Sequence, residues 1–472
     1  MNIYKKLINN SIIFAIGNLG SKLIVILLVP LYTYYLTTSE FGLVDLVTIT
    51  ASLLIPIFSM CIFDATLRFV MDKKYDEHIV LINSLVVIFI GFILLCAIYP
   101  ALIIFLPFDD YILYFYLLVL FQAIYTTLTQ YIRAKGMIRL FAISGIINSF
   151  ILLVCNLLFL ALFQAGIVGY LISFIISYIV SSLLIIIRGK IQLGFNVRKI
   201  NIKLLKEMLI YSIPLIPNAL MWWIMSFSDR YLITLFLGLS ANGLYAVANK
   251  IPSILTIINS VFFQAWQMSA IEEAESKNKN QFFSNVFNVF SIVMLISTSL
   301  IIVHLKFMME LFVADTYSEA WKYVPFLLLG VVFSSFSSFL GTNYIAARKT
   351  SGVFKTSVIG AVINIVVTIA LIPILGINGA AIGTMICFAV IWILRILDTR
   401  QFVNIKFNLR NLILTFMIIF IQIIVLYLNF QNEYLIQISL LIIIILINFR
   451  EIGTLSMKLK GLVKRKLNHK LF

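Results

Sequence analysis

The sequence predicts an all-α polytopic membrane protein. It is expected to have about 14 transmembrane helices, forming two parallel-repeat six-helix bundles around a central cavity plus two C-terminal helices. Three observations support this. Its 472 residues are 62% hydrophobic and only 11% charged, whereas soluble domains carry about 25% charged residues. Apolar runs of about 20 residues, long enough to cross a bilayer as a helix, recur along the chain. Turn motifs of the first half return in the second.

The apolar runs predict helices, because the strands of a membrane barrel would alternate over segments of about 10 residues. In chain order they lie at roughly 7–35, 43–63, 79–104, 111–132, 140–162, 166–187, 208–236, 243–266, 282–303, 323–347, 353–375, 378–397, 411–429 and 433–449.

Basic residues predict the orientation of these helices. The net charge is +16. If both termini are cytoplasmic, 30 of the 35 lysines and arginines fall in cytoplasmic segments, as the positive-inside rule expects. Topology therefore explains the basic charge, and nucleic acid is not an expected partner. The four cysteines lie in apolar runs without metal-ligand spacing, so neither a metal site nor a cofactor is predicted.

The repeat is visible in the turns between helices. Residues 36–43 resemble residues 237–244, and the turn 166–169 resembles 376–379. Six spans separate the copies, which predicts a parallel repeat about an axis along the membrane normal, with alternating access to a cavity between the bundles. The expected organisation is one bundle over 1–206, a second over 207–400, and two further helices with a basic cytoplasmic tail over 401–472.

Ionisable residues inside spans are candidate site residues, because each costs at least about 2.5 kcal/mol at mid-membrane unless it is paired or hydrated. Lys22 lies near the middle of the first run, and we expect it to line the cavity; the alternatives are a structural ion pair and a shallower depth in the membrane. Asp229 and Arg230 in the seventh run and Lys250 in the eighth are expected to lie within reach of one another, with Asp45 as a further member. They form either a substrate-binding and gating cluster or a salt bridge that only sets helix packing.

Two further pairs are weaker candidates. Asp64 and Arg68 are spaced i, i+4 and share one helix face, as a gating pair or a local ion pair. Trp222 and Trp223 lie near mid-helix rather than at an interface, so one of them is expected to face the cavity and bind substrate.

The turn Leu36 to Leu43 and the segment 212–251, with Pro214, Pro217 and the run Asp229-Arg230-Tyr231, resemble the Wzx-type polysaccharide-biosynthesis flippases. These belong to the multidrug/oligosaccharidyl-lipid/polysaccharide exporter superfamily. The resemblance implies a bacterial inner-membrane protein that is not an enzyme. It would translocate an undecaprenyl-pyrophosphate-linked oligosaccharide for O-antigen, capsule or exopolysaccharide assembly.

The same resemblance implies further partners: the lipid bilayer, a coupling ion (proton or sodium), a polysaccharide polymerase and glycosyltransferases. The related flippases of lipid-linked peptidoglycan precursors carry a basic residue after a serine in the first helix, and Ser21-Lys22 is similar. Those proteins have further first-helix charges where this chain has Leu28 and Val29, which argues against a peptidoglycan precursor.

Two other functions remain open. A drug or cation antiporter of the same superfamily is the first alternative, although such a pump favours acidic residues in its cavity and the deepest charge here is a lysine. A membrane polysaccharide polymerase or glycosyltransferase is less favoured, because the predicted outer loops are short.

Overall fold

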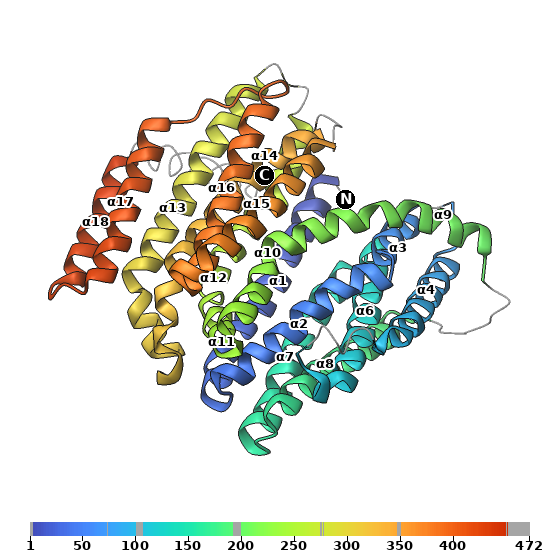
Figure 1. Ribbon diagram of the computed structural model, residues 1–472. Helices are drawn as coiled ribbons and strands as arrows, with labels where there is room; N and C mark the ends of the chain where they lie inside the picture. Colours follow the sequence, from blue (N-terminus) through green and yellow to red (C-terminus); the bar gives the residue numbers. More distant parts are fainter. Residues whose placement is uncertain are drawn as a thin grey trace, which may run out of the picture. The chain divides into compact units, whose positions relative to one another are not determined.

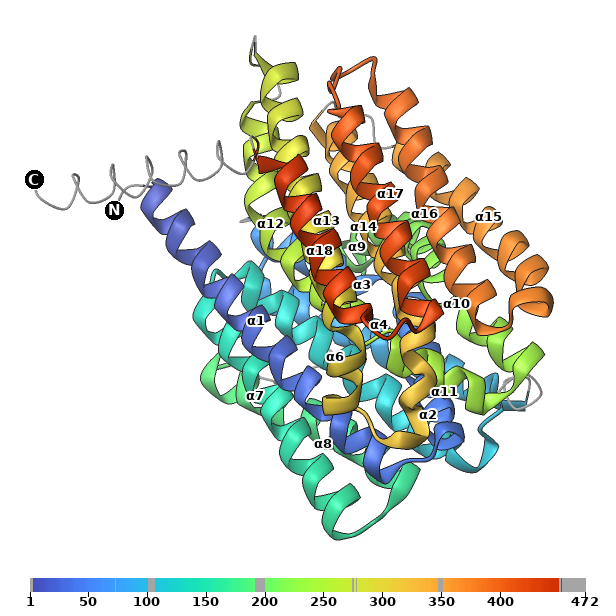
Figure 2. The same ribbon diagram turned by 90° about the vertical axis from the view of Figure 1, so that its left-hand side faces the viewer.

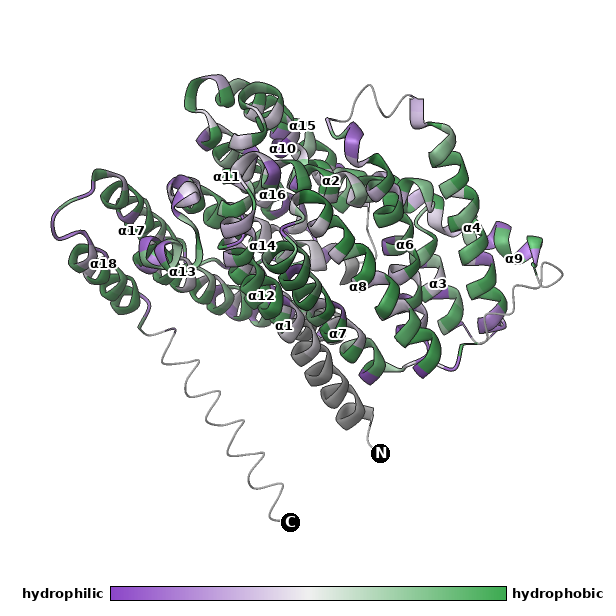
Figure 3. Cartoon of the chain, turned by 90° about the horizontal axis from the view of Figure 1, so that it is seen from below, coloured by the Kyte–Doolittle hydropathy of each residue, from purple (hydrophilic) through white to green (hydrophobic). Residues whose placement is uncertain are grey.

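A computed structural model of the chain describes residues 3–72, 74–100, 107–191, 200–273, 276, 278–346, 351–449 and 451. Every regular element in these residues is helical, and hydrophobic residues predominate in most of the helices that are coloured by hydropathy (Figure 3). The predicted basic cytoplasmic tail lies outside the described residues from 452 onward.

Helix length and hydropathy agree with a polytopic membrane protein. In the described part of the chain, 11 helices can cross a membrane by length and composition, and a broken pair, Leu239–Ala248 with Pro252–Phe263, makes 12. Two shorter apolar helical stretches accompany them: Leu19–Tyr35, which is part of the first helix, and Glu433–Ile447. Each of the fourteen predicted runs corresponds to one of these segments, so the predicted all-α membrane fold is confirmed.

Contacts divide the chain into two compact units. Unit 1 comprises Met1–Lys250, Phe312–Ser318 and Thr368–Ala380, and unit 2 comprises Ile251–Leu311, Glu319–Val367 and Ala381–Phe472. The predicted boundary at 206/207 follows the sequence repeat, whereas the contacts group residues 207–250 with the first repeat. The division into repeat bundles therefore stays a prediction.

Unit 1 contains the first six spans, the seventh, and the first segment of the broken eighth, Leu239–Ala248. Its helices are α1 (Ile3–Tyr35), α2 (Thr38–Phe58), α3 (Ile62–Met71), α4 (Glu77–Ala97), η1 (Asp109–Tyr111), α6 (Ile112–Ala134), α7 (Ile138–Asn156), η2 (Leu157–Leu162), α8 (Gly166–Arg188), α9 (Ile202–Ser212), η4 (Ile213–Leu215), α10 (Ile216–Leu237) and α11 (Leu239–Ala248).

Local sequence explains where one of these helices begins and where another is interrupted. Thr37 and Glu40 form a capping box that starts α2: the Thr37 N–H donates to the Glu40 carboxylate at 2.8 Å, and the Glu40 N–H donates to the Thr37 hydroxyl at 3.3 Å. Pro214 lies in the single 3-10 turn that separates α9 from α10. Proline has no N–H to donate and its ring clashes with the preceding turn, which explains why the helix of the seventh span is interrupted here.

The repeated turn 166–169/376–379 has one conformation in both halves. Gly166 has φ +53° and Gly376 has φ +60°, a left-handed region that is open to glycine with little strain. The sequence echo therefore reflects the same backbone requirement at the start of two helices.

Unit 2 contains the remaining spans. Its helices are α12 (Pro252–Glu272), α13 (Lys279–Phe312), η5 (Asp315–Tyr323), α14 (Val324–Ala346), α15 (Ser351–Leu375), α16 (Ile377–Thr399), α17 (Leu409–Leu428) and α18 (Glu433–Ile447), with short stretches at 312–318 and 368–380 grouped with unit 1. The pair α17–α18 lies beside α13 (Figure 1).

Polar bonds attach this C-terminal pair to α13 within unit 2. The Ser299 hydroxyl on α13 donates to the Gln422 side chain at 2.8 Å. The amide groups of Gln422 on α17 and Gln437 on α18 each donate to the main-chain carbonyl of the other, at 3.3 and 2.8 Å. Lipid tails are as apolar as leucine, so such hydrogen bonds and close packing hold membrane helices together.

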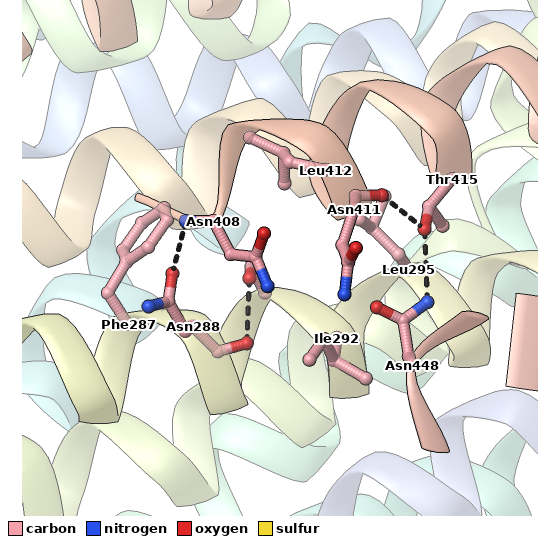
Figure 4. A pocket seen from close by; sticks show the side chains of 10 residues that line it. Phe287, Asn288, Ile292, Leu295, Asn408, Asn411, Leu412, Thr415 and Asn448 are labelled. Carbon is pink, nitrogen blue, oxygen red and sulfur yellow. Dashed lines mark hydrogen bonds between the residues drawn. The ribbon is translucent and has the colours of Figure 1, made fainter. Parts of the chain in front are cut away.

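The linker before α17 is bound along one face of α13. Asn280, Ser284 and Asn288 accept hydrogen bonds from the main-chain N–H groups of residues 404, 406 and 408, at 3.0, 2.8 and 3.1 Å. Figure 4 shows the last of these bonds. Four residues of the α13 helix rise about 6.0 Å, and two residues of an extended chain span about 6.6 Å. Every fourth residue of α13 can therefore bind every second N–H of the linker.

We expect Asn288→Ala to lower the thermal unfolding temperature in detergent by several degrees, because Asn288 bonds both the Asn408 N–H and the Lys406 carbonyl, the latter at 3.1 Å. Each lost hydrogen bond costs about 1 kcal/mol. The matched control is Asn285→Ala, which removes an exposed amide from the same helix. Equal unfolding temperatures for the two variants would contradict a stabilising role of these hydrogen bonds between α13 and the linker.

Candidate functional site

The two copies of the repeated first turn lie against each other in unit 1, where α2 crosses α11 (Figure 1). A Cβ atom on Gly42 would lie 2.0 Å from the Leu239 carbonyl oxygen, and a Cβ atom on Gly243 would lie 1.9 Å from the Thr38 carbonyl oxygen. Because 239 and 243 are the counterparts of 38 and 42 at an offset of 201, the contact is reciprocal, as across a local two-fold axis.

Hydrogen bonds supplement this close crossing of backbones. The hydroxyl oxygens of Thr38 and Ser240 are 2.7 Å apart. The Asn242 amide donates to the Gly42 carbonyl at 2.8 Å. Small residues at such crossings are typical of membrane helix packing, because they let the main chains approach.

Three of the predicted charged residues meet next to this crossing. Asp45 on α2 pairs with Arg230 on α10, with 2.8 Å between Oδ2 and Nε. The neighbouring Asp229 accepts a hydrogen bond from the Tyr245 hydroxyl on α11. Asp45, Asp229 and Arg230 are 8%, 2% and 7% exposed, so the cluster is buried and its carboxylates are engaged.

Aromatic rings surround the cations of this cluster. The Arg230 guanidinium lies 5.2 Å from the centroid of Phe227 and 5.9 Å from that of Tyr245. The Lys250 ammonium lies 5.7 Å from the centroid of Phe41. Such cation–π contacts stabilise a cation where water is scarce. Lys250 also lies at the break between α11 and α12, outside either helix.

The structure places the two tryptophans differently. The Trp223 indole N–H donates to the Ile49 carbonyl at 2.9 Å and to the Ser52 hydroxyl at 3.1 Å, and so joins α10 to α2. Trp222 is partly buried. A substrate-binding role for either residue remains a prediction.

Asp64 and Arg68 lie on α3 as predicted, but no ion pair joins them. The two side chains therefore do not form the local ion pair in this conformation, and a gating role for them stays a prediction. Asp64 is in the first turn of this ten-residue helix and Arg68 in the last. Each charge is thus favourably placed in the helix dipole without the other.

Lys22 lines a cavity of about 320 Å³ between α1, α6 and α7. Figure 2 shows α1 and α7 side by side. The residues that line it are Gly17, Ser21, Lys22, Tyr125, Thr129, Phe141, Ala142, Gly145, Asn148 and Ser149. Among the described residues, no acidic side chain pairs with the Lys22 ammonium. This cation therefore lines a partly open pocket in unit 1 that has both polar and apolar side chains in its wall.

Sequence reasoning missed the neutral members of this pocket. Tyr125, Thr129 and Asn148 are single polar residues on mostly apolar helices, and only the depth of Lys22 indicated a polar region nearby. It also missed Arg395 in unit 2, which is 1% exposed and donates to the Ser337 carbonyl at 2.9 Å and to the Thr356 hydroxyl at 3.1 Å. Its position near the predicted end of a span suggested a solvated loop residue.

Comparison with known proteins identifies the family. The model of the polysaccharide biosynthesis protein family matches residues 7–267. The chain belongs to the polysaccharide biosynthesis protein family. The resemblance inferred from the sequence, to Wzx-type flippases of the multidrug/oligosaccharidyl-lipid/polysaccharide exporter superfamily, is thereby confirmed.

A curated relative is an uncharacterized membrane protein of Methanocaldococcus jannaschii, 28% identical over 249 residues. The match covers 47% of this chain and 48% of the relative, so it spans about half the length of that protein.

Solved structures share the fold. The lipid II flippase MurJ in an inward closed conformation has a TM-score of 0.70 at 16% identity, over 94% of this chain and 99% of MurJ. A MATE transporter of Vibrio cholerae, VcmN, has a TM-score of 0.59 at 13% identity, over 84% and 96% of the two chains. These likenesses show the fold, which is that of a multi-pass helical membrane protein.

Proposed function

We propose that this polysaccharide biosynthesis family member flips an undecaprenyl-pyrophosphate-linked oligosaccharide repeat unit from the cytoplasmic to the outer leaflet of a bacterial inner membrane. The observation that carries the proposal is Lys22, a cation without an acidic partner among the described residues, in a pocket of about 320 Å³ that several hydroxyl and amide side chains line. A pyrophosphate and sugar hydroxyls need such a path, since removing them from water without compensation costs several kcal/mol per group.

The buried carboxylates favour this function over a cation antiporter. Asp45 contacts Arg230 and Asp229 contacts Tyr245, so these acids are engaged within the protein. A cation exporter needs a carboxylate that its substrate can reach. The solved MurJ structure is named for a lipid II flippase, which supports a lipid-linked cargo by analogy.

The membrane potential is the proposed energy source, either alone or with a coupled proton or sodium ion. An anionic head group that moves outward from a negative interior gains about 2.3 kcal/mol per charge per 100 mV. This direction of transport rests on the predicted orientation, with both termini in the cytoplasm.

Purified protein in sealed vesicles tests the proposal, with the labelled lipid-linked oligosaccharide initially in one leaflet and its appearance in the other followed by membrane-impermeant periodate oxidation. We expect Lys22→Gln to lower the initial rate at least tenfold, because the head group loses its cation, and Lys22→Arg to retain most of it.

The matched control is Lys190→Gln, which removes an exposed charge outside the helices and should leave the rate unchanged. A wild-type rate for Lys22→Gln would refute the assigned role of Lys22. If wild-type vesicles move no lipid-linked oligosaccharide but expel a cationic dye, the antiporter is correct instead.

A further inference from the structure

The hydroxyl groups of the Lys22 pocket already donate hydrogen bonds within the protein, but their oxygens can still accept them. Four hydroxyl groups line it, and each donates its hydrogen to a main-chain carbonyl. Ser21 donates to Gly17 at 2.9 Å, Thr129 to Thr126 at 2.7 Å, Ser149 to Gly145 at 3.2 Å and Tyr125 to Ser144 at 3.4 Å. A hydroxyl that already donates can still accept. These four oxygens are therefore acceptors for a ligand that brings its own O–H groups.

Two other groups in the pocket are donors. The Asn148 side-chain nitrogen is buried and has no acceptor in the described part of the chain. A buried donor without an acceptor is unfavourable. The Lys22 ammonium adds three N–H donors and a positive charge. Asn148 and Lys22 together therefore suit a ligand group that accepts hydrogen bonds and carries a negative charge.

The size of the space also suits a small molecule. A water molecule occupies about 30 Å³ in the liquid, so 320 Å³ is far more than one structural water needs. It lies at the lower end of small-molecule pockets, about 300–1,000 Å³. Small residues leave this room: a Cβ atom on Gly145 would lie 3.2 Å from the Ser21 hydroxyl.

We infer that this pocket binds one monosaccharide unit that carries a negatively charged substituent, a carboxylate or a phosphate. The anionic group would lie at Lys22 and Asn148, and the sugar hydroxyls would donate to Ser21, Thr129 and Ser149. The inference rests on the proposed function and adds to it the part of the cargo that unit 1 recognises. The charge has two possible sources: an acidic sugar within the oligosaccharide, or the phosphate on its first sugar.

Binding of small probes to the purified full-length protein tests this inference without translocation. The probes are glucuronate, glucose 1-phosphate, glucose and inorganic phosphate, each titrated in detergent and followed by saturation-transfer NMR. We expect glucuronate or glucose 1-phosphate to bind at least tenfold more tightly than glucose and than inorganic phosphate. Tighter binding of glucuronate assigns the charge to an acidic sugar, and tighter binding of glucose 1-phosphate assigns it to the phosphorylated sugar.

Variants locate the binding in this pocket. Lys22→Gln should weaken the preferred probe at least tenfold and Lys22→Arg much less. Asn148→Asp, which places a negative charge beside the anion, should abolish binding, whereas Asn285→Asp on an exposed face of α13 should not. Wild-type unfolding temperatures establish that each variant is folded. If Asn148→Asp misfolds, Asn148→Leu, similar in volume and without the donor, replaces it.

Two outcomes overturn the inference: glucose or inorganic phosphate binding as tightly as the tighter of glucuronate and glucose 1-phosphate, or no probe binding at concentrations up to tens of millimolar. Neither of them requires that flipping fail. Conversely, probe binding in a protein that does not flip lipid-linked oligosaccharide would leave the pocket assigned and refute the proposed function.

Discussion

Alanine at Gly42 or at Gly243 is expected to force α2 and α11 apart. The added methyl carbon would lie 2.0 or 1.9 Å from a main-chain carbonyl oxygen of the other helix, so a side-chain rotation cannot relieve the clash. Overpacking of this kind costs about 1–3 kcal/mol or more. We therefore expect a lower unfolding temperature in detergent and a slower rate of flipping.

Cysteine pairs measure the separation directly. In a background without the four native cysteines, Thr38→Cys with Ser240→Cys should form a disulfide readily, because the native hydroxyl oxygens are 2.7 Å apart. Adding Gly243→Ala should slow this cross-link. Gly330→Ala on α14 is the control, since its methyl group would meet no atom closer than 3.7 Å. Unchanged cross-linking in Gly243→Ala would contradict the described crossing.

The second large effect is expected when the buried charge pair is broken. Arg230→Gln leaves the Asp45 carboxylate without the cation 2.8 Å away, and both residues are less than 10% exposed. Removing one partner of such a pair costs about 3–5 kcal/mol. We expect a large fall in unfolding temperature and in the amount of folded protein in the membrane.

The double variant Asp45→Asn with Arg230→Gln separates pairing from other effects. It removes both charges and should recover much of the lost stability, because no unpaired charge remains buried. Asp64→Asn is the control, since no ion pair to Arg68 depends on it. If the double variant is as unstable as the sum of the single ones, Asp45 and Arg230 do not stabilise each other.

Much of the fold could be predicted because each span carries its own signal. An apolar run of about 20 residues allows few structures in a bilayer other than a helix, and all fourteen runs correspond to helical segments. The grouping of α11 with the first repeat could not be predicted. It depends on the approach of Gly42 to Leu239 and of Gly243 to Thr38, which lie some two hundred residues apart.

The candidate site, too, could be predicted from the sequence only in part. Charges inside apolar runs are conspicuous, so Lys22, Asp45 and Arg230 could be selected from the sequence, and the structure pairs the last two. Neutral polar residues are too frequent in membrane helices to be selected individually. Asn148 became a candidate only when the structure placed it in the same pocket as Lys22, with its side-chain nitrogen buried and without an acceptor.

The hydrogen bonds between α13 and the linker before α17 determine which linker residues can change during evolution. Asn280, Ser284 and Asn288 bind main-chain groups of the linker before α17, and every residue other than proline supplies the same N–H group. Residues 404, 406 and 408, whose side chains are exposed, can therefore be exchanged during evolution without detaching the last two helices, provided that the length of the linker is kept. A single inserted residue would shift the register and turn alternate N–H groups away from their acceptors.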